Sequence, residues 1–272
     1  MTSLDDAERL KELRKKIFIT AINGGISHLA SAFSCLEIIY TLYMKGAMKF
    51  DPCDPDMPHR DRLVLSKGHG GLALYAVMCE AGYFSDDKLK TYLKSLGGEP
   101  SMRDLRGIEA STGSLGHGLS VAAGMAMAQK MDDTCARTFA IIGDGECQEG
   151  TIWECAISAS ALGLDNLVAI LDCNGLQKMC ETRETMKNTN WREKFEAFGW
   201  LCDEADGHDV DEMKEILTRE NSSGKPLLLI AHTVKGKGVS IMENNPVWHF
   251  KLPNKKETKI FKNELGILDG EM

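Results

Sequence analysis

The sequence predicts an α/β protein with a mostly parallel sheet that is covered by helices on both faces. Apolar, strand-like runs alternate with helical segments, and several of these runs end in polar or Gly-containing residues. This alternation is typical of parallel sheets, in which a helix usually connects one strand to the next. The length of 272 residues suffices for one large domain, and no convincing boundary divides it. We therefore expect a single domain over residues 1–272.

The first third of the chain is predicted to be mainly helical. Apolar residues recur at helical spacing over 7–22 and from Ser34 to Met44, with the Gly-containing break NGGISH between them. Residues 50–62 are rich in Pro and Asp and are expected to form a loop. This loop leads into a short buried strand, LVLS at 63–66, and then through KGHGG into a helix over 72–82.

The rest of the chain continues the alternation of strand, loop and helix. Further strands are expected over 138–145 and 166–174, and the same pattern recurs in PLLLIAHTVKGKG at 226–238. Helices are expected over 119–130 and 153–163. Residues 97–118 are polar and Gly-rich, which indicates an ordered binding loop, and 251–272 are expected to form a surface-docked tail or helix.

Composition argues against several classes of protein. The net charge of −8 argues against a basic surface for nucleic acid. The nine cysteines include no C-x-x-C pair, which argues against a zinc knuckle and fits reduced thiols in a cytosol. The charged N-terminus does not resemble a signal peptide, and no apolar run approaches the roughly 18 residues that span a membrane. We expect a cytoplasmic protein that binds neither nucleic acid nor membranes.

The sequence Gly143-Asp144-Gly145 and the residue Asn174 both lie at the ends of predicted parallel strands. In an open α/β sheet, ligands bind at the carboxyl ends of the strands. Asp144 and Asn174 could therefore provide two oxygen ligands for a small hard cation, which readily shares them with phosphates, and the carbonyl of Leu176 could add a third. The Gly-Asp-Gly sequence alone could equally be a strand-end turn, but its pairing with Asn174 favours a ligand site.

This pattern, GDGECQEGTIWE followed by LDCNGLQ, resembles the thiamine diphosphate motif. Three further stretches resemble transketolases in particular, namely SKGHGGLALYAV, GIEASTGSLGHGLSVAAGMA and HTVKGKGVSIMENNPVWH. The resemblance extends from about residue 20 to residue 250, nearly the whole chain. The segment HLASAFS is less specific, because deoxyxylulose phosphate synthases carry similar sequence, but those enzymes lack the KGHG and STGSLG forms found here.

The resemblance implies a role for each matching residue. Mg²⁺ or Ca²⁺ would be held on the diphosphate by Asp144, Asn174 and the carbonyl of Leu176. His28 would contact substrate hydroxyls, and His28, His69 and His249 would assist proton transfer or bind intermediates. The residues expected at the cofactor are Lys67, His69, Gly113, Leu115, Asp144, Gly145, Asn174, Lys235 and His249.

Two acidic residues match a pair that lies at the subunit interface of transketolases. These residues, Glu149 and Glu154, are proposed in the family to couple two active sites, so the resemblance implies a catalytic role for them. They could instead simply stabilise the start of a helix through its dipole. Three of the remaining histidines, His59, His208 and His232, are expected to be structural, and the role of His117 is left open.

Two departures from the family pattern concern the substrate channel. Glu99 stands where transketolases carry a His that touches the donor ketose, which reverses the charge and removes a hydrogen-bond donor. Phe250 stands where a Gly often follows the channel histidine, and its ring would narrow or reshape the entrance. We therefore expect an altered donor or acceptor rather than loss of the cofactor.

The resemblance also implies that half of the active site lies on another chain. In full-length transketolases a pyrimidine-binding domain and a C-terminal domain follow this one, whereas the present sequence ends at Met272. We expect a partner subunit that carries them, an α2β2 assembly, and activity only in that assembly. The expected reaction transfers a two-carbon ketol unit from a ketose, such as a sugar phosphate, to an aldehyde. The alternatives are a pyruvate-dependent thiamine diphosphate synthase or decarboxylase subunit, or a non-catalytic, cofactor-binding regulatory homologue.

Overall fold

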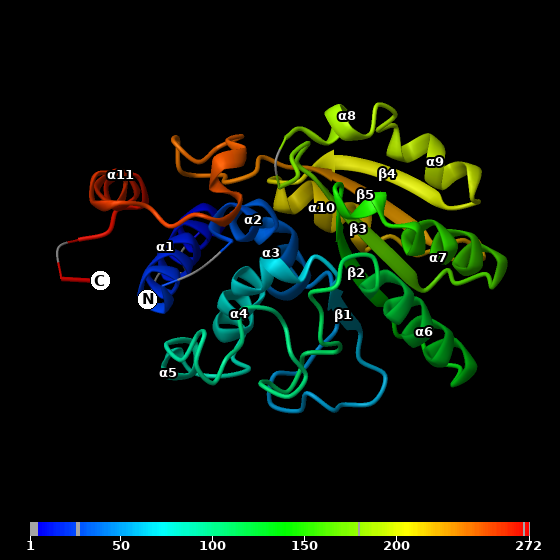
Figure 1. The fold of residues 1–272 in the computed structure, drawn as a ribbon. Helices are drawn as coiled ribbons and strands as arrows, with labels where there is room; N and C mark the ends of the chain where they lie inside the picture. Colours follow the sequence, from blue (N-terminus) through cyan, green and yellow to red (C-terminus); the bar gives the residue numbers. More distant parts are fainter. Residues whose placement is uncertain (1–4, 26–27, 179, 269, 272) are drawn as a thin grey trace.

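A five-stranded parallel sheet forms the centre of the computed structural model, which describes residues 5–25, 28–178, 180–268 and 270–271 (Figure 1). Its strand order is β1-β2-β3-β5-β4, and every neighbouring pair is parallel. The predicted fold class is therefore confirmed. The strands are β1 (Arg62–Leu65), β2 (Thr138–Gly143), β3 (Leu167–Cys173), β4 (Leu201–Asp206) and β5 (Leu227–His232).

Four of the five strands coincide with the predicted apolar runs, whereas the strand pattern did not predict β4. The four are β1, β2, β3 and β5, whose residues are mostly buried. The missed strand has the sequence LCDEAD, pairs only with β5 and has a single buried residue, Ala205. An edge strand that faces solvent needs no apolar run, so the signal that revealed the central strands is missing from it.

Helices cover both faces of the sheet (Figure 1). The predicted helix over Ser34–Met44 is divided at Cys35, and the predicted helix at 153–163 begins earlier, at Gly150. No helix of the described residues is both long and apolar enough to cross a membrane. The α-helices are α1 (Asp6–Gly24), α2 (Leu29–Ser34), α3 (Leu36–Met44), α4 (Gly71–Glu80), α5 (Asp86–Leu89), α6 (Gly118–Met131), α7 (Gly150–Ala161), α8 (Thr182–Thr185), α9 (Trp191–Ala197), α10 (Val210–Leu217) and α11 (Lys255–Leu265). The short 3₁₀ helices are η1 (Gly68–Gly70), η2 (Glu146–Gln148) and η3 (Pro246–Phe250).

Alternating residues of each central strand point into two separate apolar clusters. In β2, Phe139 and Ile141 pack with helices α1 to α4, α10 and α11, whereas Ala140 and Ile142 pack with α6, α7 and α9. A strand that is buried on both faces must be apolar at successive positions. This requirement explains why β2 contains the uninterrupted apolar run FAII at 139–142.

The register of the sheet brings several loops to one edge. Gly143 of β2 pairs with Asp172 of β3, and Cys173 of β3 pairs with His232 of β5. The residues that follow these strands, including Asp144 and Asn174, therefore emerge side by side at the carboxyl ends. The long 97–118 segment forms no helix or strand before α6 begins at Gly118, as expected of a loop.

Candidate cofactor and active site

A cavity of about 700 Å³ lies at the carboxyl ends of the central strands. Loops that are far apart in the sequence line it, because parallel strands all deliver their following loops to the same edge. Of the residues predicted for the site, the structure places these in the wall of the cavity: His28, Lys67, His69, Glu99, Gly113, Leu115, Asp144, Gly145, Asn174, Leu176, Lys235 and His249.

Three predicted residues lie outside the cavity wall. Phe250 is 55% exposed in η3, and its ring lies 4.7 Å from the ring of His28 between centroids. Glu149 is the N-cap residue of α7 and makes no side-chain cap hydrogen bond, and Glu154 lies on the exposed side of the same helix. The two acids therefore do not face the cavity within this chain.

The oxygen atoms of Asp144, Asn174 and Leu176 suit a hard divalent cation. Asp144 is only 3% exposed, and none of the residues that the structure describes forms an ion pair with it. Its carboxylate accepts hydrogen bonds from the backbone N–H groups of Gly145 at 2.8 Å and Gly175 at 2.7 Å. Burial, together with the nearby charge of Asp172, raises the pKa of Asp144 to about 6. A buried carboxylate without a counter-ion beside two neutral oxygen donors fits Mg²⁺ or Ca²⁺.

Lys235 provides positive charge next to this oxygen set. Its Nζ donates to the carbonyl of Leu176 at 3.1 Å, and that oxygen retains a second lone pair for a cation. Burial and the charge of Lys67 lower the pKa of Lys235 to about 8, so the amine is still mostly protonated at neutral pH. Within the described part of the chain, no carboxylate lies within ion-pair distance of Lys235. An anionic ligand would therefore meet an ammonium group whose charge is not paired with a carboxylate.

Three histidines cluster at the cavity. The ring of His28 lies 5.4 Å from that of His69 and 5.3 Å from that of His249, between centroids. Burial and the nearby lysine charges lower the pKa of His28 to about 4 and of His249 to about 3. The same causes lower the pKa of His69 well below its ordinary value. All three rings are therefore neutral at physiological pH, and each has one nitrogen to donate and one to accept a hydrogen bond.

We expect the free energy of unfolding to decrease as the pH falls from about 6.5 towards 4. The unfolded chain protonates His28 near its ordinary pKa of 6.5, whereas the folded chain protonates it only near 4. Above pH 6.5 His28 is neutral in both states and does not weaken the fold. Below that pH the unfolded chain binds a proton that the folded chain does not, and the free energy of unfolding falls. Urea unfolding at several pH values should show that the free energy of unfolding depends less steeply on pH in the His28→Asn variant than in the wild type. The exposed His59 is the control, and an equal change in slope for His59→Asn would contradict the prediction.

Glu99 lies against the loop that is expected to contact the cofactor. Gly113 has a φ of +145°, and a Cβ atom at this position would collide with Oε2 of Glu99. The hydroxyl of Tyr75 donates to the backbone carbonyl of Glu99 at 2.7 Å, which anchors this part of the chain. The carboxylate thus covers Gly113 at the cavity wall, where a ligand can reach it. This position is compatible with a substrate-binding role.

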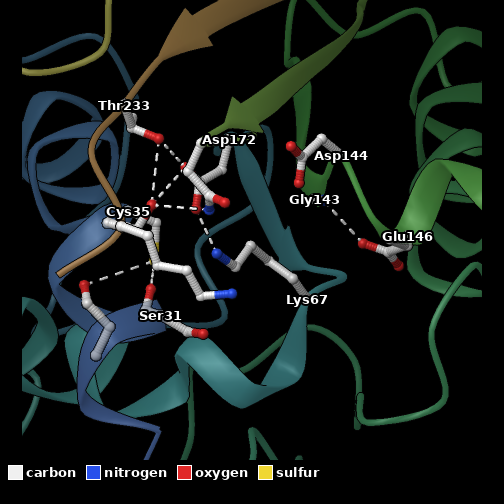
Figure 2. A network of polar contacts seen from close by, with 12 residues as sticks. Ser31, Cys35, Lys67, Gly143, Asp144, Glu146, Asp172 and Thr233 are labelled. Atoms are coloured by element: carbon white, nitrogen blue, oxygen red, sulfur yellow. Dashed lines mark hydrogen bonds and ion pairs between the residues drawn. The ribbon is translucent and has the colours of Figure 1, made fainter. Parts of the chain in front are cut away.

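The motifs did not reveal several residues that support the site. Asp172 is fully buried and forms an ion pair with Lys67, and the hydroxyl of Thr233 donates to the same carboxylate (Figure 2). Glu146, which is also buried, accepts hydrogen bonds from the N–H groups of Gly116 at 2.7 Å and Gly143 at 3.0 Å. A sequence signal did exist for Asp172, because a charged residue inside an apolar strand run requires a buried partner.

The histidines expected to be structural include two with clear partners. Nε2 of His208 accepts from the N–H group of Val234 at 2.8 Å, so Nδ1 carries the proton that faces Glu37 at 3.2 Å. His232 contacts Glu204 at 2.8 Å on the sheet edge. These contacts connect different elements of the fold.

Comparison with known proteins reveals both sequence and structural relatives. The family model described as transketolase, thiamine diphosphate binding domain, matches residues 17–271. One subunit of an apulose-4-phosphate transketolase from Actinobacillus succinogenes is 38% identical over 270 residues, which cover 97% of each chain. A 6-deoxy-6-sulfo-D-fructose transketolase subunit, SqwG, from Clostridium sp. (strain MSTE9) is 42% identical over 229 residues, which cover 83% of each chain.

The structural comparison agrees with these matches. The crystal structure of transketolase from Campylobacter jejuni superposes with a TM-score of 0.86 at 28% sequence identity. The superposition covers 97% of the present chain but only 43% of the Campylobacter chain. The chain thus spans less than half of that transketolase, although it spans most of the two separate subunits.

Proposed function

The chain belongs to the transketolase family, in which it corresponds to the thiamine diphosphate-binding domain, and from this premise we propose that it is one subunit of a two-component transketolase. The observation that carries the proposal is that oxygen atoms of the buried Asp144, of Asn174 and of Leu176 lie together in the wall of one cavity. We propose that these atoms hold Mg²⁺ or Ca²⁺ on the diphosphate of the cofactor. The relatives described above are named as transketolases, which favours ketol transfer over the pyruvate-dependent and non-catalytic alternatives.

The partner subunit is proposed to carry the pyrimidine-binding and C-terminal domains. The relative from Actinobacillus is named as one subunit of its transketolase, and the present chain matches it over nearly its whole length. The Campylobacter transketolase, by contrast, has a single chain more than twice as long. An α2β2 assembly with cofactors between the subunits accounts for both facts. In such an assembly Glu149 and Glu154, exposed at the start of α7, would be available for the interface role that the family suggests.

Bound thiamine diphosphate supplies the carbanion chemistry that breaks and forms the carbon–carbon bond. The residues of this chain bind the cofactor and manage protons around it. Gly113, Gly145, Lys67, Lys235 and Leu115 lie in the cavity wall, where they would contact the cofactor. Nζ of Lys235 lies 3.2 Å from Nδ1 of His249 and donates to it while protonated. The proton of the neutral His249 ring is then on Nε2, where it can be donated to a substrate oxygen.

Reconstitution tests the proposed function directly. The chain would be produced together with its partner and supplied with thiamine diphosphate, Mg²⁺, a ketose donor and an aldehyde acceptor. We expect ketol transfer by the complex and none by either chain alone. Consumption of pyruvate in place of a ketose would overturn the proposal in favour of a synthase or decarboxylase. Cofactor binding without turnover of any donor would instead indicate a regulatory homologue.

Glu99 and Phe250 are proposed to set the choice of substrate. The carboxylate of Glu99 accepts hydrogen bonds but cannot donate them when ionised, so it would select a donor that presents a hydroxyl at this position. The exposed ring of Phe250 lies against His28 and would restrict the entrance from the other side. Both residues are therefore candidates for the residues that distinguish the substrate choice of this chain from that of transketolases that use common ketose phosphates.

We expect Glu99→His to lower kcat/KM for the natural donor by roughly 10-fold to 100-fold, since a hydrogen bond to a charged group contributes about 1.5–3 kcal/mol. Activity with ordinary ketose phosphates should rise relative to that donor. The measurement is kcat/KM across a panel of ketoses. Glu99→Gln is the matched control, because it keeps the shape and one acceptor oxygen but removes the charge. Unchanged activity of Glu99→His on every donor would show that Glu99 does not select the donor.

A further inference from the structure

The side-chain amide of Asn174 makes different contacts at its two ends. Nδ2 donates to the hydroxyl oxygen of Ser34 at 3.1 Å, and Oδ1 accepts from the backbone N–H of Leu176 at 3.0 Å. The two ends of an amide have almost the same shape, so only hydrogen bonds determine which end faces which neighbour. The orientation matters for function, because the oxygen can bind a cation and the NH₂ group cannot.

The hydroxyl of Ser34 has no proton left for Asn174. Ser34 is fully buried, and its single proton is donated to Oδ1 of Asp172 at 2.7 Å. Asp172 is also fully buried and is paired with the ammonium group of Lys67, so its ionised carboxylate can only accept hydrogen bonds (Figure 2). The oxygen of Ser34 therefore remains an acceptor on its Asn174 side.

The neighbouring hydroxyl of Thr233 does not free the proton of Ser34 for Asn174. Its hydroxyl lies 3.2 Å from that of Ser34, and either atom could be the donor on distance alone. However, Thr233 also donates its only proton to Oδ1 of Asp172 (Figure 2). This is the same oxygen that accepts the hydrogen bond of Ser34. Both hydroxyl protons are thus committed to the carboxylate. Among the described residues, the remaining N–H donor that reaches Ser34 from the cavity side is the amide of Asn174.

We infer that Lys67, Asp172 and Ser34 form a chain of contacts that, together with the N–H group of Leu176, fixes the Asn174 amide with its oxygen towards the cation site. Lys67 pairs with Asp172, the carboxylate of Asp172 accepts the hydrogen bond of the Ser34 hydroxyl, and the oxygen of Ser34 then accepts a hydrogen bond from the NH₂ end of Asn174. Ser34 and Asp172 are thereby positioning residues for metal binding. This inference rests on the proposed function, because that function supplies the cation.

Ser34→Ala and Thr233→Val test the inference as a matched pair. Each removes one buried hydroxyl that donates to Asp172, but only Ser34 contacts Asn174. The complex of the chain with its partner would be titrated with Mg²⁺ at fixed thiamine diphosphate, and cofactor binding would be followed by calorimetry. We expect Ser34→Ala to raise the half-saturating Mg²⁺ concentration by about 10-fold to 100-fold, the usual effect of losing a residue that orients a metal ligand.

The Thr233→Val control and the measurement of kcat distinguish a defect in the orientation of Asn174 from a general loss of packing. Thr233→Val should change the Mg²⁺ requirement by less than about threefold, within the range of a weak indirect effect, although both variants lower the unfolding temperature. Saturating Mg²⁺ should restore most of kcat to Ser34→Ala, because the defect lies in metal affinity. Ser34→Cys is nearly isosteric and a poor acceptor, so it gives the same test with less disturbance of packing.

The possible outcomes distinguish this inference from the proposed function. Equal shifts in Mg²⁺ requirement for Ser34→Ala and Thr233→Val, or no shift for Ser34→Ala and Ser34→Cys, would overturn the inference alone. A wild-type complex that binds no thiamine diphosphate at any Mg²⁺ concentration would overturn the proposed function, and the inference with it.

Discussion

Replacing Asp144 with asparagine is expected to lower ketol transfer by at least roughly 10³-fold, because a bound cation contributes several kcal/mol and each 1.36 kcal/mol is a factor of ten. Asp144 is the only charged group in the proposed oxygen set, and an amide has neither its charge nor its second oxygen. The variant should also lose the rise in unfolding temperature that Mg²⁺ and thiamine diphosphate together give the wild type.

A remote carboxylate provides the control for this prediction. Asp132 is exposed at the C-terminal end of α6, and Asp132→Asn should retain activity and the ligand-induced rise in unfolding temperature. Circular dichroism of both variants checks that the fold is kept. If Asp144→Asn bound cofactor with the wild-type Mg²⁺ requirement, the cation would have to be held elsewhere, and the proposed oxygen set would be wrong.

Replacing Lys67 with methionine is expected to destabilise the chain by about 3–5 kcal/mol, the usual result when one partner of a buried ion pair is removed. Lys67 is 2% exposed and Asp172 is fully buried, so the remaining carboxylate would be a buried charge without its ion-pair partner. Burial opposes its ionisation, and the charge of Lys67 is what holds the pKa of Asp172 below its usual range. The stabilisation is therefore present at neutral pH and is lost as the pH falls through that lowered pKa.

Urea unfolding without cofactor measures this loss, and two further variants interpret it. The double variant Lys67→Met/Asp172→Asn removes both charges and should lose less stability than Lys67→Met alone. Lys90→Met breaks an exposed pair with Asp87 and should change the free energy of unfolding much less than Lys67→Met does, because solvent screens a surface pair. If Lys67→Met and Lys90→Met lowered the free energy of unfolding equally, the Lys67–Asp172 pair would contribute no more to stability than a surface contact does.

The central strands and the cavity edge could be predicted because their physical requirements appear in single residues. Strands buried on both faces must be continuously apolar, so β1, β2, β3 and β5 are visible in the sequence, whereas the exposed edge strand β4 is not. Parallel strands end at one edge, so Asp144 and Asn174 could be expected to meet without any coordinates. The family resemblance then named most of the residues that line the cavity.

The placement of Phe250 and Glu149 could be read only from the structure. The resemblance assigned Phe250 to the entrance of the channel and Glu149 to a subunit interface, and the structure places Phe250 beside His28 and leaves Glu149 exposed at the start of α7. A motif match shows which residue occupies a position. It does not show which way the side chain points, since that depends on packing against neighbours from other segments.

What the sequence by itself determined is the α/β class, the central strands that deliver the loops, and the family. It also led to the oxygen donors that we propose for a cation. Only the tertiary structure decided how these donors are held. Ser34 ends α2, Lys67 follows β1, Asp172 lies on β3 and Thr233 follows β5, and no pattern within any one segment links the four. A hydrogen bond depends on distance and on which atom carries the proton, and both are defined only once the folded chain brings distant segments together.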